Sequence, residues 1–354
     1  MTAQTGTLAP DPGTADNPAT VTIGLWGPAQ SGKTTYLAAL PIAVSDGNTR
    51  NGSWIIYPRS PGSRELMDRF EHSLVEERRF PQTTVSATPT PLEWLFVGHL
   101  SGSSFDQRLL RRFRREIESS FVLDLIDVYG RAYQRKAEET AAAAEDGADG
   151  DAAHASAALD HLAQAQGIIF LFDPVGERDN QNSAAFVGAT ANELRLRVAQ
   201  HKANPGRYLD KHVSVCVTKF DDPDVFDQAQ KRNLVTYGAD GMPYVREADA
   251  KRFFDELCLG MFWAEHADAG REQAEFVRDQ LRNLFRPDHI RYFVTSSIGF
   301  WMEPPAGSGT SPRFNPDDPS NSNLRDHRPG IRGKVRPINV LEPLISLQRR
   351  ITGG

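Results

Sequence analysis

The segment GPAQSGKT, residues 27–34, holds the residue types that bind phosphate groups. It fits the pattern GxxxxGK[ST], and it lies between an apolar run and a helix-compatible stretch. Glycines let main-chain N–H groups turn around oxygen atoms, and the start of the following helix adds partial positive charge. We expect phosphate contacts from the whole loop: Gly27, Gln30, Ser31, Gly32, Lys33, Thr34 and Thr35. A glycine turn that fits the pattern by chance is the alternative.

Two side chains of this loop have expected roles in chemistry. The Lys33 ammonium can reach the outer phosphates of a nucleotide and so act in catalysis, and the Thr34 hydroxyl can hold Mg²⁺.

A second pattern, DxxG, follows the apolar run 121–126 as Asp127 and Gly130. An aspartate at a strand end can reach Mg²⁺ through water, while a glycine N–H contacts the γ-phosphate. The pattern is short and weak on its own. We interpret Asp124, in mid-strand, as a structural or edge carboxylate.

A third pattern, TKFD, comes after the apolar run 213–217 and supplies Thr218, Lys219 and Asp221. A carboxylate here can accept hydrogen bonds from both N1–H and the exocyclic amine of guanine, a pair of donors that adenine does not offer. The Lys219 stem can lie along the base and ribose. TKFD alone is equally compatible with a plain turn, but its place after the two other motifs favours a guanine site.

Alternation of strand and helix patterns predicts the elements that position these motifs. The expected strands are 21–26, 92–99, 121–128, 168–172, 213–218 and 291–295. Helical spacing of apolar residues occurs at 63–79, 184–203, near 253–261 and 276–285, and at 338–347. Several of the strand runs are apolar on both faces, which is typical of a mostly parallel sheet with helices on both sides.

With these motifs in this order, the chain resembles the Ras-like P-loop GTPases of the translation-factor-related (TRAFAC) class over about residues 21–300. The resemblance implies a Ras-like α/β fold that binds GTP or GDP with Mg²⁺ and hydrolyses GTP. It also implies that Ser296 and Ser297 contact the base, and that a threonine, Thr84 or else Thr83, closes onto Mg²⁺ and the γ-phosphate. Asp127 and Thr34 complete the implied metal site.

One residue departs from that family. Ras-like enzymes carry a water-orienting glutamine directly after the DxxG glycine, and this chain has Arg131 there. Either another group positions the water, or a partner completes the site, or the protein binds GTP and scarcely cleaves it. Arg131 is a catalytic arginine in one interpretation and a solvated switch residue in the other.

The sequence outside the motifs predicts a disordered tail at 1–20, a domain at 21–300 and a C-terminal part at 301–354. The domain has inserts at about 137–160 and 222–288, interpreted as an acidic solvated insertion and as a helical cap or partner-binding lobe. The C-terminal part is a Pro/Gly-rich loop and a helix that packs on the same domain. These additions resemble bacterial GTPases, including the double-GTPases, and the arginine- and alanine-rich composition fits a GC-rich bacterial genome.

The formal charge of −6 argues against a direct nucleic-acid or anionic-membrane binder. No run reaches the length of a membrane span, and the first basic residue is Lys33, so we expect a cytoplasmic protein. Two separated cysteines predict buried, reduced thiols rather than a zinc site.

The sequence thus favours a slow GTPase that acts as a GTP/GDP switch toward a protein effector or activating partner. The alternatives are a GTP-loaded interaction module with little hydrolysis, or a P-loop ATPase. Asp221 and Val128, which stands where many ATPases carry a glutamate, both argue against the ATPase.

Overall fold

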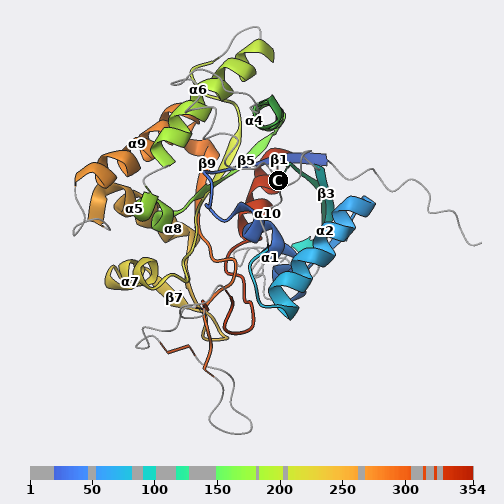
Figure 1. Ribbon diagram of the computed structural model, residues 1–354, viewed down its shortest axis with the longest axis vertical. Helices are drawn as coiled ribbons and strands as arrows, with labels where there is room; N and C mark the ends of the chain where they lie inside the picture. The colour runs from blue at the N-terminus through green and yellow to red at the C-terminus, as the bar shows by residue number, and fades with distance from the viewer. Residues whose placement is uncertain are drawn as a thin grey trace, which may run out of the picture.

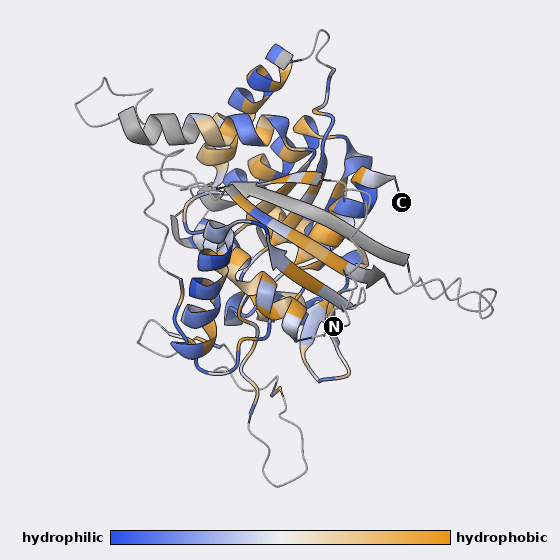
Figure 2. Ribbon diagram, turned by 90° about the vertical axis from the view of Figure 1, so that its right-hand side faces the viewer, coloured by the Kyte–Doolittle hydropathy of each residue, from blue (hydrophilic) through white to orange (hydrophobic). Residues whose placement is uncertain are grey.

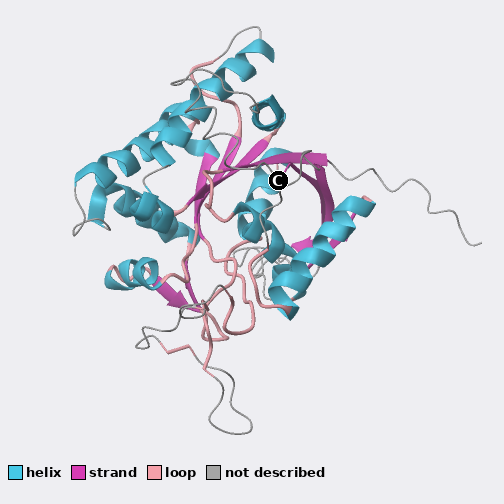
Figure 3. Ribbon diagram, in the orientation of Figure 1, coloured by secondary structure: helices cyan, strands magenta, loops and turns pink. Residues whose placement is uncertain are grey.

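The fold is α/β, with a seven-stranded, mostly parallel sheet flanked by helices on both faces (Figures 1 and 3). The computed structural model describes residues 20–46, 53–81, 91–100, 117–126, 149–180, 183–201, 206–261, 268–303, 314–315, 323–324 and 330–353. The sheet order is β2-β3-β4-β1-β5-β6-β9, and β2–β3 and β3–β4 are its antiparallel pairs. This confirms the expected α/β class.

The strands of the sheet match the apolar runs of the sequence, with one addition. They are β1 (Thr20–Trp26), β2 (Ser53–Pro58), β3 (Pro91–Leu100), β4 (Ile117–Ile126), β5 (Gly167–Phe172), β6 (His212–Val217) and β9 (Ile290–Val294). The sequence patterns missed β2, which extends the sheet at one edge, and a separate hairpin formed by β7 (Val235–Tyr237) and β8 (Pro243–Val245).

Alternation along the strands divides the core into two layers. In β5, Ile168, Phe170 and Phe172 belong to one buried cluster, and Ile169 and Leu171 belong to the other. Every residue of β5 is buried, as expected of a parallel strand covered on both faces. Figure 2 shows the apolar residues concentrated along the sheet and the helix faces turned toward it.

One face of the sheet is covered by α1 (Lys33–Ser45), α2 (Pro61–Glu71) and α10 (Glu342–Thr352). The predicted helix at 63–79 is α2 followed by one π-helical turn, His72–Glu76. The last helix begins later than its apolar pattern suggested, because Leu341 is its N-cap and Pro343 stands in its first turn. It lies across β5, β6 and β9.

The opposite face is covered by α4 (Asp149–Gln164), α6 (Ser183–His201), α8 (Glu247–Glu256) and α9 (Asp268–Leu284). Two shorter helices, α5 (Pro174–Asn180) and α7 (Pro223–Lys231), begin a few residues after the ends of β5 and β6 in the sequence. A π-helical turn, Leu257–Met261, extends α8, and a 3₁₀ turn, Pro287–His289, precedes β9. Both cysteines, Cys216 and Cys258, are buried and free.

Candidate functional site

The candidate site lies where four parallel strands end side by side. Main-chain register places Trp26 of β1 beside Phe170 of β5, and Phe172 of β5 beside Val217 of β6. Val217 is in turn beside Val294 of β9. The residues that directly follow these strands therefore share one edge of the sheet, which is where open α/β sheets bind ligands.

The phosphate-loop motif forms the connection between β1 and α1, as its pattern predicts. Gln30 and Gly32 have left-handed φ values of 64° and 92°, a conformation found where successive amides curl around an anion. A Cβ on Gly27 would lie 2.7 Å from the Ser31 hydroxyl and 3.0 Å from the Leu171 carbonyl, so any larger residue would crowd the loop against β5. The loop is a tight cradle whose shape its glycines determine.

Lys33, the first residue of α1, is buried and folds back over this loop. Its ammonium donates hydrogen bonds to the carbonyl oxygens of Gly27 at 2.8 Å and Pro28 at 2.6 Å. A positive charge is thereby held at the loop and at the N-terminal end of α1, where the helix dipole also favours an anion.

One hydroxyl in the loop is left unsatisfied. Ser31 Oγ is buried and has no hydrogen-bond partner among the described residues, and such a group costs free energy unless a ligand or water pairs with it. A glycine cradle, a held lysine and an unsatisfied hydroxyl fit the phosphates of a nucleotide. Thr34 and Thr35, in the first turn of α1, are half-buried.

The predicted base-contacting residues meet at the ends of β6 and β9. We call residues 295–299 the base loop. The Asp221 carboxylate accepts a hydrogen bond from the Ser296 hydroxyl of this loop. Ser296 Oγ itself accepts a hydrogen bond from the Gly299 N–H at 2.8 Å, so its single proton is directed to Asp221. Ser297 is half-buried beside it.

Burial shapes the ionisation of Asp221. This side chain is buried, and desolvation raises its pKa to about 6, although the Ser296 hydrogen bond acts in the opposite direction. Asp221 is therefore mostly ionised at neutral pH. It can then offer its second oxygen, and the free lone pairs of the first, to donors.

Thr218 and Lys219 occupy places that the sequence pattern did not specify. The Thr218 hydroxyl donates to the Phe172 carbonyl at 3.2 Å and so ties the end of β6 to the end of β5. Lys219 has a left-handed φ of 56°. Its ammonium lies 2.6 Å from an oxygen of Asp173, the residue that follows β5.

Asp173 is the site residue that the sequence analysis missed. Its side chain is only 3% exposed, against 37% for Lys219, and its other oxygen accepts the Gly176 N–H at 3.0 Å. The ion pair with this buried carboxylate therefore holds the Lys219 ammonium in place. The signal for Asp173 was present in the sequence, because this residue follows an apolar strand directly, as Asp127 does.

The remaining predicted residues, Thr83, Thr84, Asp127, Gly130 and Arg131, lie outside the described residues. The structure does place the strand that leads to two of them. β4 runs parallel to β1, with Leu123 beside Val21, and ends at Ile126. The strand before Asp127 is thus the neighbour of the strand before the phosphate loop.

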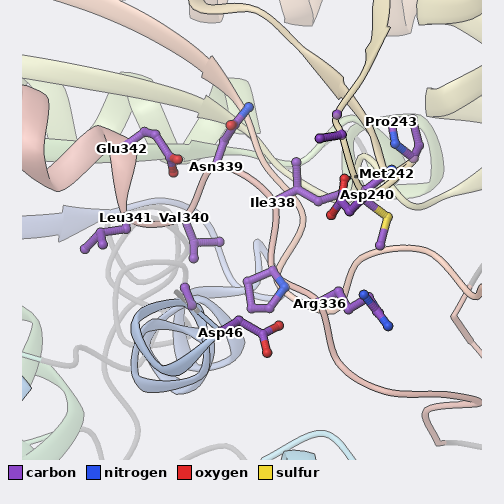
Figure 4. Close-up of a pocket in the computed structure, with 14 residues that line it drawn as sticks. Asp46, Asp240, Met242, Pro243, Arg336, Ile338, Asn339, Val340, Leu341 and Glu342 are labelled. Carbon is purple, nitrogen blue, oxygen red and sulfur yellow. Dashed lines mark hydrogen bonds between the residues drawn. The ribbon is translucent and has the colours of Figure 1, made fainter. Parts of the chain in front are cut away.

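A separate pocket of about 250 Å³ lies beside this region, between the end of α1, the β7–β8 hairpin and residues 336–342 (Figure 4). It holds none of the predicted site residues. In the described part of the chain, no group of three or more His, Cys, Asp or Glu side chains is arranged to hold a metal ion. No helix there is both long and apolar enough to cross a bilayer.

No protein-family model matches this sequence, and no curated protein matches it. Solved GTPases and GTPase-like domains are among the structures that resemble the fold. The Ski7 GTPase-like domain of S. cerevisiae bound to GTP is 11% identical, with a TM-score of 0.36, over 95% of this chain and 51% of that one. The chain thus spans about half the length of the Ski7 chain.

The signal recognition particle receptor SRb-GTP/SRX complex of Chaetomium thermophilum gives 16% identity and a TM-score of 0.34, over 79% of this chain and 92% of that one. A bacterial selenocysteine-specific elongation factor, EF-Sec, gives 14% and 0.24, over 75% and 28%. These are similarities to translation-factor and signal-recognition-particle GTPases, without a family assignment by sequence. At such scores they add nothing to the argument about function, which rests on the geometry above.

Proposed function

We propose that this protein binds GTP and GDP with Mg²⁺ and is a slow GTPase that works as a conformational switch. One observation carries the proposal: a glycine cradle with a held lysine and a buried aspartate bonded to Ser296 lie at the same edge of one sheet. The first fits phosphates, and the second fits the paired donors of guanine.

The site residues that the structure describes have the following roles in this proposal. The loop amides and Lys33 hold the β- and γ-phosphates, and the Ser31 hydroxyl gains a partner there. Asp221 accepts hydrogen bonds from the N1–H and amine of guanine, while Lys219, braced by Asp173, lies along the nucleoside. Thr34 is the metal ligand within the described residues. Bound Mg²⁺ would neutralise charge on the phosphates.

The hydrolytic and switching parts of the proposal rest on the sequence. Asp127, Gly130 and Thr84 would sense the γ-phosphate, and its loss would release Thr84 and Gly130 and change a surface read by an effector. Arg131 cannot orient the attacking water, because a guanidinium has no hydrogen-bond acceptor. We therefore expect turnover on the order of 10⁻³ s⁻¹ or less, near that of an unassisted GTPase.

Arg131 also supports a second candidate function, a GTP-loaded interaction module with little hydrolysis. Asp221 argues against the ATPase alternative, because adenine offers no pair of donors to this carboxylate. The proposed domain spans residues 21–300, and the proposed setting is the cytoplasm of a bacterium.

Affinities for GTP, GDP and ATP, with and without Mg²⁺, test nucleotide choice, and single-turnover phosphate release tests hydrolysis. ATP binding as tight as GTP binding would overturn the proposal. Arg131→Gln then separates the two functions. A faster variant means that the site lacked a water-orienting group, a slower one makes Arg131 a charge-stabilising finger, and no change favours the interaction module.

A further inference from the structure

A segment near the C-terminus, residues 330–341, lies directly against the base loop. Ser296 and Ile338 exchange two main-chain hydrogen bonds, of 3.0 Å from the Ser296 N–H and 2.8 Å from the Ile338 N–H. The Arg336 N–H donates to the Ile298 carbonyl at 3.0 Å. The residue whose side chain holds Asp221 is thus held, through its main chain, by the 330–341 segment.

The base loop and the 330–341 segment approach each other so closely that one residue of the loop must be glycine. Gly299 has a left-handed φ of 68°, and a Cβ on it would lie 2.1 Å from the Arg336 carbonyl oxygen. A side chain there can be accommodated only if the 330–341 segment moves away. Gly299 also donates to Ser296 Oγ, so the close approach and the orientation of the hydroxyl depend on the same turn.

The same segment contacts the helix that follows the phosphate loop. The buried Tyr36 hydroxyl donates to the Val340 carbonyl at 2.6 Å, and Lys334 forms an ion pair of 2.5 Å with Asp46 at the end of α1. Burial raises the pKa of Tyr36 well above its ordinary value, so the phenol stays a neutral donor. The 330–341 segment therefore bridges the phosphate-loop helix and the base loop.

The other side of the segment faces the 250 Å³ pocket. Figure 4 shows Asn339 and Val340 on one side of Ile338, and Asp240 and Met242 of the hairpin region on the other. Asn339, with a left-handed φ of 51°, donates to the Val245 carbonyl at 3.3 Å and the Val294 carbonyl at 3.0 Å. The segment is thus held at defined points between the base loop and a space that it borders.

We propose that the 330–341 segment is a specificity element of the nucleotide site. By fixing the main chain of Ser296, it holds the Asp221 carboxylate where both of its oxygens can meet guanine. Displacing the segment lets Ser296 turn and leaves the exocyclic amine of guanine without its acceptor. The inference rests on the proposed GTP site, and it assigns to a distant part of the chain the discrimination between guanine and hypoxanthine, which lacks that amine.

The variant Gly299→Ala tests this, with Gly241→Ala as its matched control. Gly241 also has a left-handed φ, of 78°, but a Cβ on it would meet nothing within 4 Å, so the control has the same backbone cost without displacing the segment. The readout is the ratio of GTP to ITP affinity. We expect Gly299→Ala to lower this ratio at least about tenfold, as for loss of a hydrogen bond to a charged group, and Gly241→Ala to leave it within about twofold.

Hydrogen exchange in the wild-type protein gives a second test that needs no variant. Binding is reciprocal, so GTP should slow exchange at the amides of Ser296, Arg336 and Ile338 more than ITP does. Equal protection by both nucleotides, or an unchanged affinity ratio in folded Gly299→Ala, overturns the inference while the GTP site stands. A wild-type protein that binds neither nucleotide overturns the proposed function, and the inference with it.

Discussion

The phosphate loop and the proposed guanine site differ in how far apart in the sequence their residues lie. Residues 27–34 form the phosphate loop almost alone, with one glycine approaching the β5 main chain. The proposed guanine site combines the end of β6, the base loop and residues 336–338, which are far apart in the sequence. A local site is readable from a motif, whereas an assembled site depends on contacts that no motif encodes.

The two sites also differ in what they lack. The phosphate loop contains a buried Ser31 hydroxyl with no partner among the described residues. The Asp221 carboxylate, in contrast, already has its Ser296 partner. In the proposed function, a ligand would complete the first site, whereas the second is organised in advance.

Replacing Lys33 with alanine should have the largest effect, because the change removes a charge from the phosphate loop. Hydrogen bonds to charged groups contribute about 1.5–3 kcal/mol each, so losing contacts to two phosphates should weaken GTP binding more than about 100-fold. Equilibrium titration of the folded variant measures this. Lys231→Ala, which removes a solvent-exposed lysine paired with Asp227, is the control and should bind normally. Unchanged affinity in Lys33→Ala would contradict the phosphate role.

Asp221→Asn should reverse base preference. An amide offers one acceptor and one donor group in place of two acceptors, so GTP should bind about 10–100-fold more weakly and xanthosine triphosphate, whose C2 carbonyl accepts, more tightly. Competition titration with both nucleotides reads this out. The neighbouring Asp222→Asn is a matched control, because its oxygen caps α7 by accepting the amides of Asp224 and Val225, and asparagine can do the same. Equal loss in both variants would point to folding rather than recognition.

Asp173→Asn should have an intermediate effect through Lys219. The amide can still accept the Gly176 N–H, but it no longer pairs its charge with the lysine. We expect GTP, GDP and ITP affinities to fall together, by about three- to tenfold, since Lys219 does not read the exocyclic amine. Selective loss of GTP over ITP would contradict this assignment, as would a variant whose binding is unchanged.

Acid should weaken GTP binding by the smallest amount. The pKa of Asp221 is raised to about 6, so its carboxylate gains a proton as pH falls through that value and loses an acceptor. About a quarter remains ionised at pH 5.5, which predicts roughly fourfold weaker binding than at pH 7.5. The effect of pH on the folding stability of the free protein has the opposite sign to its effect on binding. Because the pKa of Asp221 is raised by folding, this group favours folding at low pH, and that contribution is lost as pH rises through 6. Asp221→Asn lacks the carboxylate, so the pH dependence of its GTP affinity measures how much of the profile comes from titration of the nucleotide phosphates.

The sequence predicted the fold well because apolar strands covered on both sides leave a strong local pattern. The runs near Val21, Ile168 and Val213 each became a strand of the sheet. β2 was missed although Trp54, Ile55 and Tyr57 are residue types that favour strands. Only Trp54 is buried in it, and Ile55 and Tyr57 are exposed, so this edge strand lacks the burial on both faces that marks the central strands. Its pairing with β3 is determined by tertiary contacts rather than by its local sequence.

The site was predictable where side chains carry the chemistry and unpredictable where the main chain does. Lys33 and Asp221 belong to spaced motifs, and Asp173 could have been found by the same strand-end rule. The bonds between Ser296 and Ile338 join main-chain groups, which every residue except proline carries in full. No residue type marks such a contact, so only the folded chain reveals it.

The hydrogen bond from Tyr36 to Val340 joins residues 304 positions apart, and this has a consequence for synthesis on the ribosome. The phosphate loop and the start of α1 emerge before the C-terminal segment, so the phenol has no carbonyl to meet until Val340, 304 residues later, has been made. Chains fold from the N-terminal part first, and long-range contacts form late. A nascent chain should therefore form its glycine cradle well before the proposed guanine site is complete.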